Sequence, residues 1–278
     1  MVEILSNPFF QRALAAAAFI GFANGWFSGF VILRRSALSV SALSHTMLPG
    51  IALAILVTGA LTQWNAFAGA LFAALLVGLG SVAVARGNRI EQGTALAVLY
   101  TASFAAGVAI LPLLKTRRQL EDWLFGNILA VGNNDLAISF VSGALVLLTT
   151  SLLMRPILLT LFEPHVAAAQ GVPVRFIHYF LSGLLVLSLV SSLQAVGCVL
   201  SVGLLVAPAA TVSLMTDRTS ALFWGGGLIG AVGSAAAVMI SAKWGISPGP
   251  AIVMLLGLLF VAAYLFSPRY GLVFRKRH

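Results

Sequence analysis

Charge is scarce in this sequence. Only 8% of its 278 residues are Asp, Glu, Lys or Arg, whereas 60% are hydrophobic. A soluble domain carries about 25% charged residues, because water must solvate its surface. The deficit excludes an ordinary soluble domain and indicates that lipid or other helices surround most side chains. Hydrophobic runs extend from end to end, so we expect one integral membrane domain over residues 1–278.

Cysteine and the common catalytic motifs are also missing. Cys198 is the single cysteine, which excludes an intrachain disulfide and a cysteine-based metal cluster. The sequence has no G-x-x-x-x-G-K-[ST] run, so we do not expect it to bind nucleotide phosphates itself. The seven acids lie near the ends of apolar runs, and no nucleophile has an accompanying base and acid. We therefore predict no enzyme and no tightly bound cofactor.

The basic residues set an orientation in the membrane. The net charge is +9, yet Lys and Arg lie at the ends of apolar runs and form no block of five. This distribution is typical of membrane loops and not of a nucleic-acid-binding surface. Alternating spans gather most of them on one side, which we assign to the cytoplasm together with the C-terminus: Arg34, Arg35, Arg86, Arg89, Arg175, Arg218 and 275–277.

The apolar runs predict an all-α bundle of transmembrane helices. A span needs about 20 apolar residues to cross about 30 Å of hydrocarbon. We expect eight to nine spans, since the second run is short and the sixth and seventh are separated only by Gln194. The candidates are 10–33, 46–63, 66–85, 93–114, 136–161, 176–193, 195–215, 221–241 and 250–267.

Small residues recur at helix-packing distances within two of these runs. Glycines four residues apart share one face of a helix and let two backbones approach closely, which drives association in lipid. The pattern predicts packed helices without indicating whether the partner helix belongs to this chain. The residues concerned are Gly21, Gly25 and Gly29 in one run, and Gly226 and Gly230 in another.

Residues 33–50 are rich in hydroxyl groups and bring His45 to the start of an apolar run. An ionisable residue within a membrane is a candidate functional residue, and imidazole is the commonest metal ligand in proteins. The alternative is a structural histidine that donates a hydrogen bond to a carbonyl at a helix end.

Residues 162–174 predict a short helix between two spans. Glu163 and Pro164 are typical of a helix start, and Gly171 and Pro173 end a helix after about two turns. A plain loop needs no such helix, which indicates a docking element; a simple helical connector is the alternative. Further on, Pro208 lies inside an apolar run and predicts a helix kink there.

Together, these segments resemble the permease family of zinc-, manganese- and iron-type ABC importers. The resemblance covers residues from about 10 to 266 and rests on phrases in the family's order. These are the Leu-Arg-Arg, Ala-Leu-Ser-His and Leu-Pro-Gly-Ile-Ala-Leu-Ala phrases within 33–54, and residues 91–99, 124–131, 162–174, 193–197, 204–211 and 248–253.

The resemblance implies a multi-pass permease of the inner (cytoplasmic) membrane that works as a homo- or heterodimer. It also implies two cytoplasmic ATPase subunits, which bind the ATP, and an extracytoplasmic metal-binding protein that delivers the ion. The loop of about 162–175 resembles the helix that docks on the ATPase. Glu163 stands where the family commonly has Asp, and His165 where it has an acid; the remaining docking residues are Pro164, Ala167, Gly171 and Pro173.

The metal position departs from the family's pattern. An Asp commonly lies four residues before the His of the Ala-Leu-Ser-His phrase, and here Ser41 takes its place before His45. Residues four apart share a helix face, so Ser41 and His45 are the candidate metal contacts. The loss of the Asp leaves open a different cargo, such as a metal chelate, or an Asp-bearing sister permease. A gradient-driven secondary transporter is a further alternative, disfavoured because the acids lie at span ends.

Overall fold

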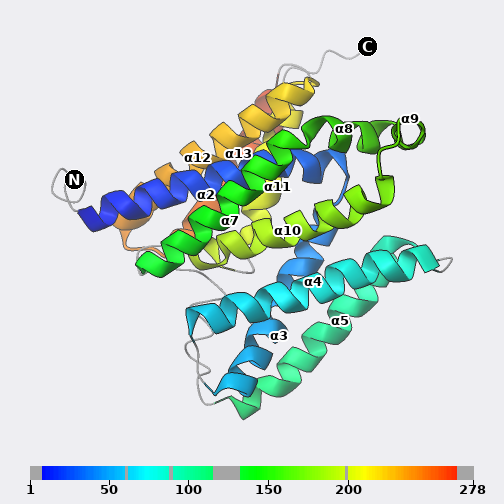
Figure 1. Cartoon of the computed structure of the whole chain (residues 1–278). Coiled ribbons are helices and arrows are strands. Elements are labelled where there is room, and N and C mark those ends of the chain that lie inside the picture. The colour runs from blue at the N-terminus through cyan, green and yellow to red at the C-terminus, as the bar shows by residue number, and fades with distance from the viewer. Residues whose placement is uncertain (1–7, 60–61, 88–89, 115–131, 198–199, 268–278) are drawn as a thin grey trace.

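The computed structural model describes residues 8–59, 62–87, 90–114, 132–197 and 200–267, and within these ranges all regular structure is helical (Figure 1). The elements are α2 (Pro8–Leu33), α3 (Ala37–Thr58), α4 (Gln63–Gly87), α5 (Gln92–Ile110), the 3-10 turn η1 (Leu111–Leu113), α7 (Asn133–Leu152), α8 (Met154–Phe162), α9 (Pro164–Ala169), α10 (Val174–Val196), α11 (Ser201–Ser213), α12 (Thr219–Trp244) and α13 (Pro248–Phe266).

Seven helices of the described ranges are long and apolar enough to cross a membrane. Helices α7 and α8, bent by 68° between them, bring the count to eight if the pair crosses as one broken span. An α-helix satisfies its backbone polar groups internally, which is why apolar sequence in lipid takes this form. The all-α prediction is confirmed, and the span count is close to the expected eight to nine. The tail at 275–277 and the phrase at 124–131 lie outside the described residues.

Two of the predicted spans need correction. The run at 46–63 belongs to a helix that begins at Ala37, so His45 is the ninth of 22 residues and does not start the helix. The run at 195–215 forms only the 13-residue α11, because α10 continues to Val196 and Gly197 ends it at a φ of 91°. At about 1.5 Å per residue, α11 is about 20 Å long and shorter than a span.

The glycines of α2 and α12 lie against one another. A methyl group added at Gly25 would lie 2.3 Å from the carbonyl oxygen of Gly226, and one at Gly21 would lie 2.3 Å from that of Gly230. At Gly29 it would meet the Phe223 ring at 2.7 Å. The two backbones are therefore in direct contact, and both faces of this glycine seam belong to one chain.

Helices α3, α4 and α5 form a second group, below the others in Figure 1. Gly50 of α3 and Gly69 of α4 face each other so closely that a methyl group at either would lie within 2.4 Å of the other's carbonyl oxygen. Gly107 of α5 packs against Pro49, which stands inside α3. The proline is accommodated because its neighbour has no side chain.

The connection between the two groups is a tight turn. Ser36 N–H donates to Val31 and Arg35 N–H donates to Ile32, while Arg35 takes a left-handed φ of 55°. This is the Schellman arrangement that usually contains glycine. It ends α2 and immediately starts α3, which fixes the direction of the helix that carries His45.

Candidate functional site: a polar cleft beside helices α3 and α5

A cleft of about 610 Å³ opens between α3 and the first half of α5. Its walls combine apolar residues with side chains that can donate oxygen or nitrogen ligands. Among the described residues, no Lys or Arg lines it. The polar lining side chains are Ser39, Ser41, His45, Glu91, Thr94 and Tyr100.

His45 lies in the cleft, half-buried, at the middle of α3. Its ring centroid is 6.4 Å from that of Tyr100 and 5.9 Å from that of Phe104, both on α5. The imidazole forms no hydrogen bond with the described part of the chain, and it is far from a helix end. A structural histidine bonded to a terminal carbonyl does not match this geometry.

Ser41 lies one turn before His45 and lines the same cleft. Its carbonyl oxygen accepts a hydrogen bond of 2.8 Å from Ser44. The two candidate metal contacts therefore share one face of α3. Within the described ranges, no three His, Cys, Asp or Glu side chains come together to hold a metal ion. One copy of the described chain thus offers His45 without a full set of strong ligands.

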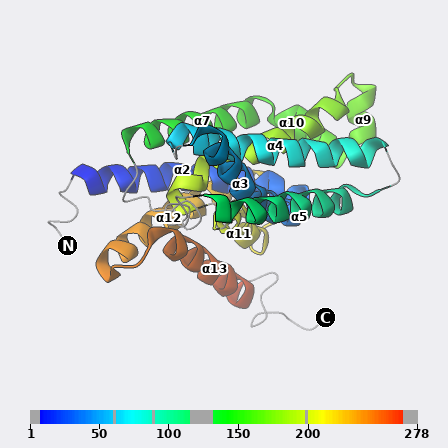
Figure 2. The same ribbon diagram turned by 90° about the horizontal axis from the view of Figure 1, so that it is seen from below.

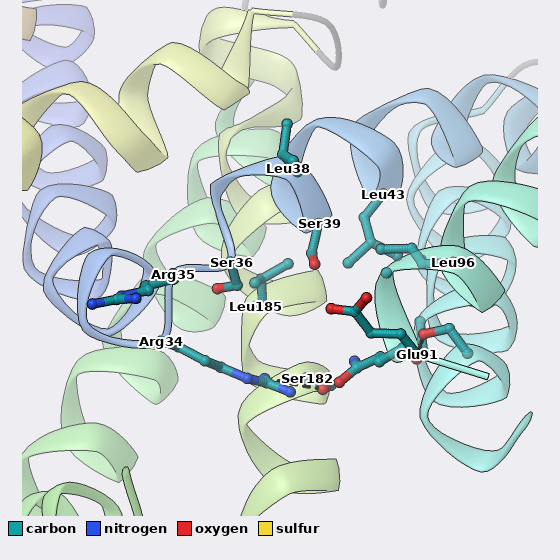
Figure 3. Close-up of a pocket in the computed structure, with 14 residues that line it drawn as sticks. Arg34, Arg35, Ser36, Leu38, Ser39, Leu43, Glu91, Leu96, Ser182 and Leu185 are labelled. Carbon is teal, nitrogen blue, oxygen red and sulfur yellow. Dashed lines mark hydrogen bonds between the residues drawn. The ribbon is translucent and has the colours of Figure 1, made fainter. Parts of the chain in front are cut away.

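A second cleft, of about 290 Å³, adjoins the first near the α2–α3 turn (Figure 3). Arg34 lines it and donates a hydrogen bond of 3.2 Å to the Ser182 hydroxyl of α10. The two clefts share Leu38, Ser39, Glu91, Gly93 and Leu96, which makes them one continuous groove. The sequence pattern alone did not indicate Glu91 as a site residue, although it precedes a span directly after a basic loop.

Positive charge gathers at this end of the bundle. Burial, and then repulsion from Arg86, lower the pKa of Arg34. Arg86 itself lies over the Tyr179 ring of α10, with the guanidinium carbon 4.6 Å from the ring centroid. Arg34 and Arg86 thus place two positive charges at the end of the bundle where α2 and α4 end.

The short helix α9 lies at the same end, where α4 ends and α10 begins (Figure 2). Glu163 occupies its N-cap position and Pro164 its first turn; Gly171 follows it at a φ of 79°. Ala167 is fully buried, whereas Glu163, His165 and neighbouring apolar side chains are exposed. The apolar ones are Phe162, Val166 and Phe176.

Pro208 lies within α11 and is buried. The next residue, Ala209, donates its backbone N–H to the Ser28 hydroxyl of α2 at 2.9 Å. A side chain of another helix thus bonds to the backbone beside the proline, as in transmembrane helices that tolerate proline.

These features define a polytopic helical membrane protein with a polar groove and a short, exposed helix between two longer ones. The chain belongs to the ABC 3 transport family, whose family model matches residues 6–267.

Curated relatives cover nearly the whole chain. It is 36% identical over 274 residues to the manganese transport system membrane protein MntC of Halalkalibacterium halodurans, covering 98% of this chain and 92% of the relative. It is 30% identical over 265 residues to the chelated iron transport system membrane protein YfeD of Yersinia pestis, covering 95% of this chain and 88% of that protein.

Solved structures have the same fold. PsaBC from Streptococcus pneumoniae in complex with Fab superposes with a TM-score of 0.83 at 31% identity, over 96% of this chain and 95% of that one. An inward-facing putative metal-chelate type ABC transporter superposes with a TM-score of 0.69, over 94% and 87% of the two chains. At 19% identity, the latter likeness shows the fold alone.

Proposed function

We propose that this chain is the membrane-spanning permease of an ATP-driven importer of divalent metal ions, and that the groove beside α3 and α5 is part of the translocation path. The observation that carries the proposal is the position of His45, halfway along a transmembrane helix and facing a polar cleft. Ionisable residues at such depth are costly and mark ion pathways.

The names of the relatives support manganese or iron as the cargo. Hydroxyl oxygens and one imidazole suit these ions better than a soft thiolate site would. Zinc also accepts imidazole, so the side chains of the cleft restrict the cargo to this group of metals without choosing among them. The Ser41 hydroxyl is a weaker ligand than a carboxylate, and it leaves His45 as the principal contact of this chain.

A second permease copy completes the site. The described ligands of one chain are too few for a metal ion, and α5 exposes much of its surface, including Val98 and Phe104. A second copy, identical or a sister bearing an Asp, would add its own ligands opposite His45 and cover this surface.

Helix α9 is the docking element for a separate ATPase subunit, which binds the ATP. Its exposed apolar side chains lie beside exposed Glu163 and His165, a composition that suits a protein interface better than bulk water. The basic end of the bundle then faces the cytoplasm. Ser267, at the end of α13, donates a hydrogen bond to the Leu214 carbonyl at the end of α11, and nearby Val212 packs with Leu33 beside Arg34. The C-terminus is therefore cytoplasmic, and an extracytoplasmic binding protein delivers the ion to the opposite side.

Metal uptake by proteoliposomes tests the proposal. The permease, its ATPase and its binding protein are reconstituted together, and Mn²⁺ uptake is measured with ATP inside. We expect uptake to require the ATPase and to fall at least about tenfold in His45→Ala, since losing even an outer-shell partner of a metal ligand costs about 10–100-fold. Thr101→Ala is the matched control, because Thr101 bonds only its own helix, at 2.7 Å to Ala97, and does not line the cleft.

Two results would contradict the proposal. ATP hydrolysis by the purified chain alone would show that it is not a dependent subunit. Mn²⁺ uptake that persists in ATP-depleted vesicles would indicate a gradient-driven transporter.

A further inference from the structure

An imported cation meets an electrostatic barrier at the basic end of the groove. Arg34 and Arg35 line the second cleft, and Arg86 lies close enough to Arg34 to affect its pKa. Helices α3 and α5 also begin here, and a helix N-terminus carries a partial positive charge. A divalent ion that leaves His45 toward this end therefore moves against positive potential unless a carboxylate offsets it.

Glu91 is the one carboxylate among the described residues lining either cleft. It precedes α5, and its side chain makes no capping hydrogen bond to that helix. Within the described ranges the carboxylate also has no ion-pair partner. Figure 3 shows the carboxylate pointing into the groove toward Ser39, while the guanidinium of Arg34 is turned to Ser182. This carboxylate is free to bind a cation.

Glu91 and His45 do not bind the same ion. His45 is level with Tyr100, which lies nine positions after Glu91 along one continuous helix. At about 1.5 Å per residue, the separation along the axis is about 13 Å, much longer than any span of two ligands across one metal ion. The groove thus presents two separate side chains to a passing cation, His45 in the middle of α3 and Glu91 at its basic end.

We propose that Glu91 forms a second, weak binding site for the divalent cation, at the end of the groove where the ion leaves the permease. This inference rests on the proposed function and extends it to a residue and a step. The ligands are the Glu91 carboxylate, the Ser39 hydroxyl and water, which suit a hard ion such as Mn²⁺.

The nearby arginines lower the affinity of this site for a cation, and a site from which an ion is released should have low affinity. Conduction requires a site attractive enough to enter and weak enough to leave. The carboxylate cancels part of the positive potential while the ion passes, and Arg34 then favours its departure. Glu91 also restores to the groove a negative charge that Ser41 does not supply.

Charge-specific variants in the reconstituted transporter test this. We expect Glu91→Gln to lower the initial rate of Mn²⁺ uptake roughly tenfold, since one carboxylate is removed from an ion path, and Glu91→Asp to keep most of it. Asp217→Asn is the matched control, because Asp217 is an exposed acid outside both clefts. ATP hydrolysis and thermal stability should not change in any of these variants.

A second experiment changes Arg34 in the Glu91→Gln background. If positive potential is the barrier, Arg34→Gln should recover part of the uptake lost in Glu91→Gln. Uptake by Glu91→Gln within twofold of the unmodified transporter would overturn the inference while leaving the proposed function intact. Loss of stability in Glu91→Gln and Glu91→Asp alike would show a structural role and would also overturn it. If the unmodified transporter moves no Mn²⁺, the proposed function is wrong, and the proposed release site at Glu91 is wrong with it.

Discussion

Ser188 of α10 donates a hydrogen bond of 2.8 Å to the Asn24 side-chain oxygen of α2, in a fully buried position. The Asn24 amide in turn donates to the Ile20 carbonyl of its own helix at 2.9 Å. Both polar groups are satisfied, and the pair joins two helices that are 164 residues apart in sequence.

We predict that this pair contributes measurably to stability. Interhelical hydrogen bonds in membranes contribute about 0.6 kcal/mol on average and up to about 1.7 kcal/mol. A double-mutant cycle with Asn24→Ala and Ser188→Ala, read by thermal unfolding in detergent, should give a coupling energy in this range. Ser191→Ala is the control, because Ser191 bonds the Ser188 carbonyl within its own helix; a coupling energy of zero would refute the prediction.

The glycine seam predicts opposite effects for two identical substitutions. Gly25→Ala places a methyl group 2.3 Å from a carbonyl oxygen and should destabilise the protein by about 1–3 kcal/mol through overpacking. Gly183→Ala on α10 meets no atom within 4 Å and should be neutral or stabilising by up to about 1 kcal/mol, since alanine favours the helix. Unfolding temperatures of the two variants measure the difference, and equal values would contradict direct backbone contact.

Restoring a carboxylate at position 41 should tighten metal binding. Ser41 and His45 share a face of α3 within the cleft, so Ser41→Asp brings a charged ligand beside the imidazole. We expect the Mn²⁺ concentration for half-maximal uptake to fall about tenfold, while tighter binding slows release. Ser41→Asn keeps the size without the charge and should have little effect. The same change with both variants would attribute it to packing and not to ligation.

Helix α9 should lose its partner when its exposed apolar surface is charged. Val166 is 43% exposed, and burying a valine contributes about 1.5–3 kcal/mol. Val166→Asp should therefore weaken association with the ATPase at least about tenfold, measured by co-purification. Gln170→Asp adds the same charge at the end of α9 without removing apolar surface and should retain binding. Equal retention by both variants would place the ATPase elsewhere.

Hydropathy predicted the helical class because a chain with so little charge has few other options in lipid. It misplaced the start of α3, since residues 37–45 are rich in hydroxyls and lower the local hydropathy. The structure shows why a helix tolerates them: Ser44 and Thr46 donate to carbonyls three residues earlier, at 2.8 and 2.7 Å. Polarity satisfied within the helix costs little in a membrane.

For the candidate site, the sequence predicted the part that depends on local helix geometry and missed the part that depends on helix packing. A spacing of four placed Ser41 and His45 on one face, because that geometry is local. Glu91 lies 46 residues beyond His45 in the sequence, and only the packing of α5 on α3 brings it to the same groove. The glycine repeats had the same limit, since spacing shows that a helix packs closely without identifying its partner.

The direct contact between α2 and α12 also restricts how the molecule can move. Two backbones in direct contact, with no side chains between them, cannot slide past one another without steric collision. These two helices therefore move as one rigid unit. Helices α3 to α5 follow α2 through the turn at Arg35 and also pack on α10 and α11, and they carry both proposed cation positions of the groove. We therefore expect a movement that opens the groove to shift this three-helix group along its contacts with α10 and α11, while α2 and α12 stay together.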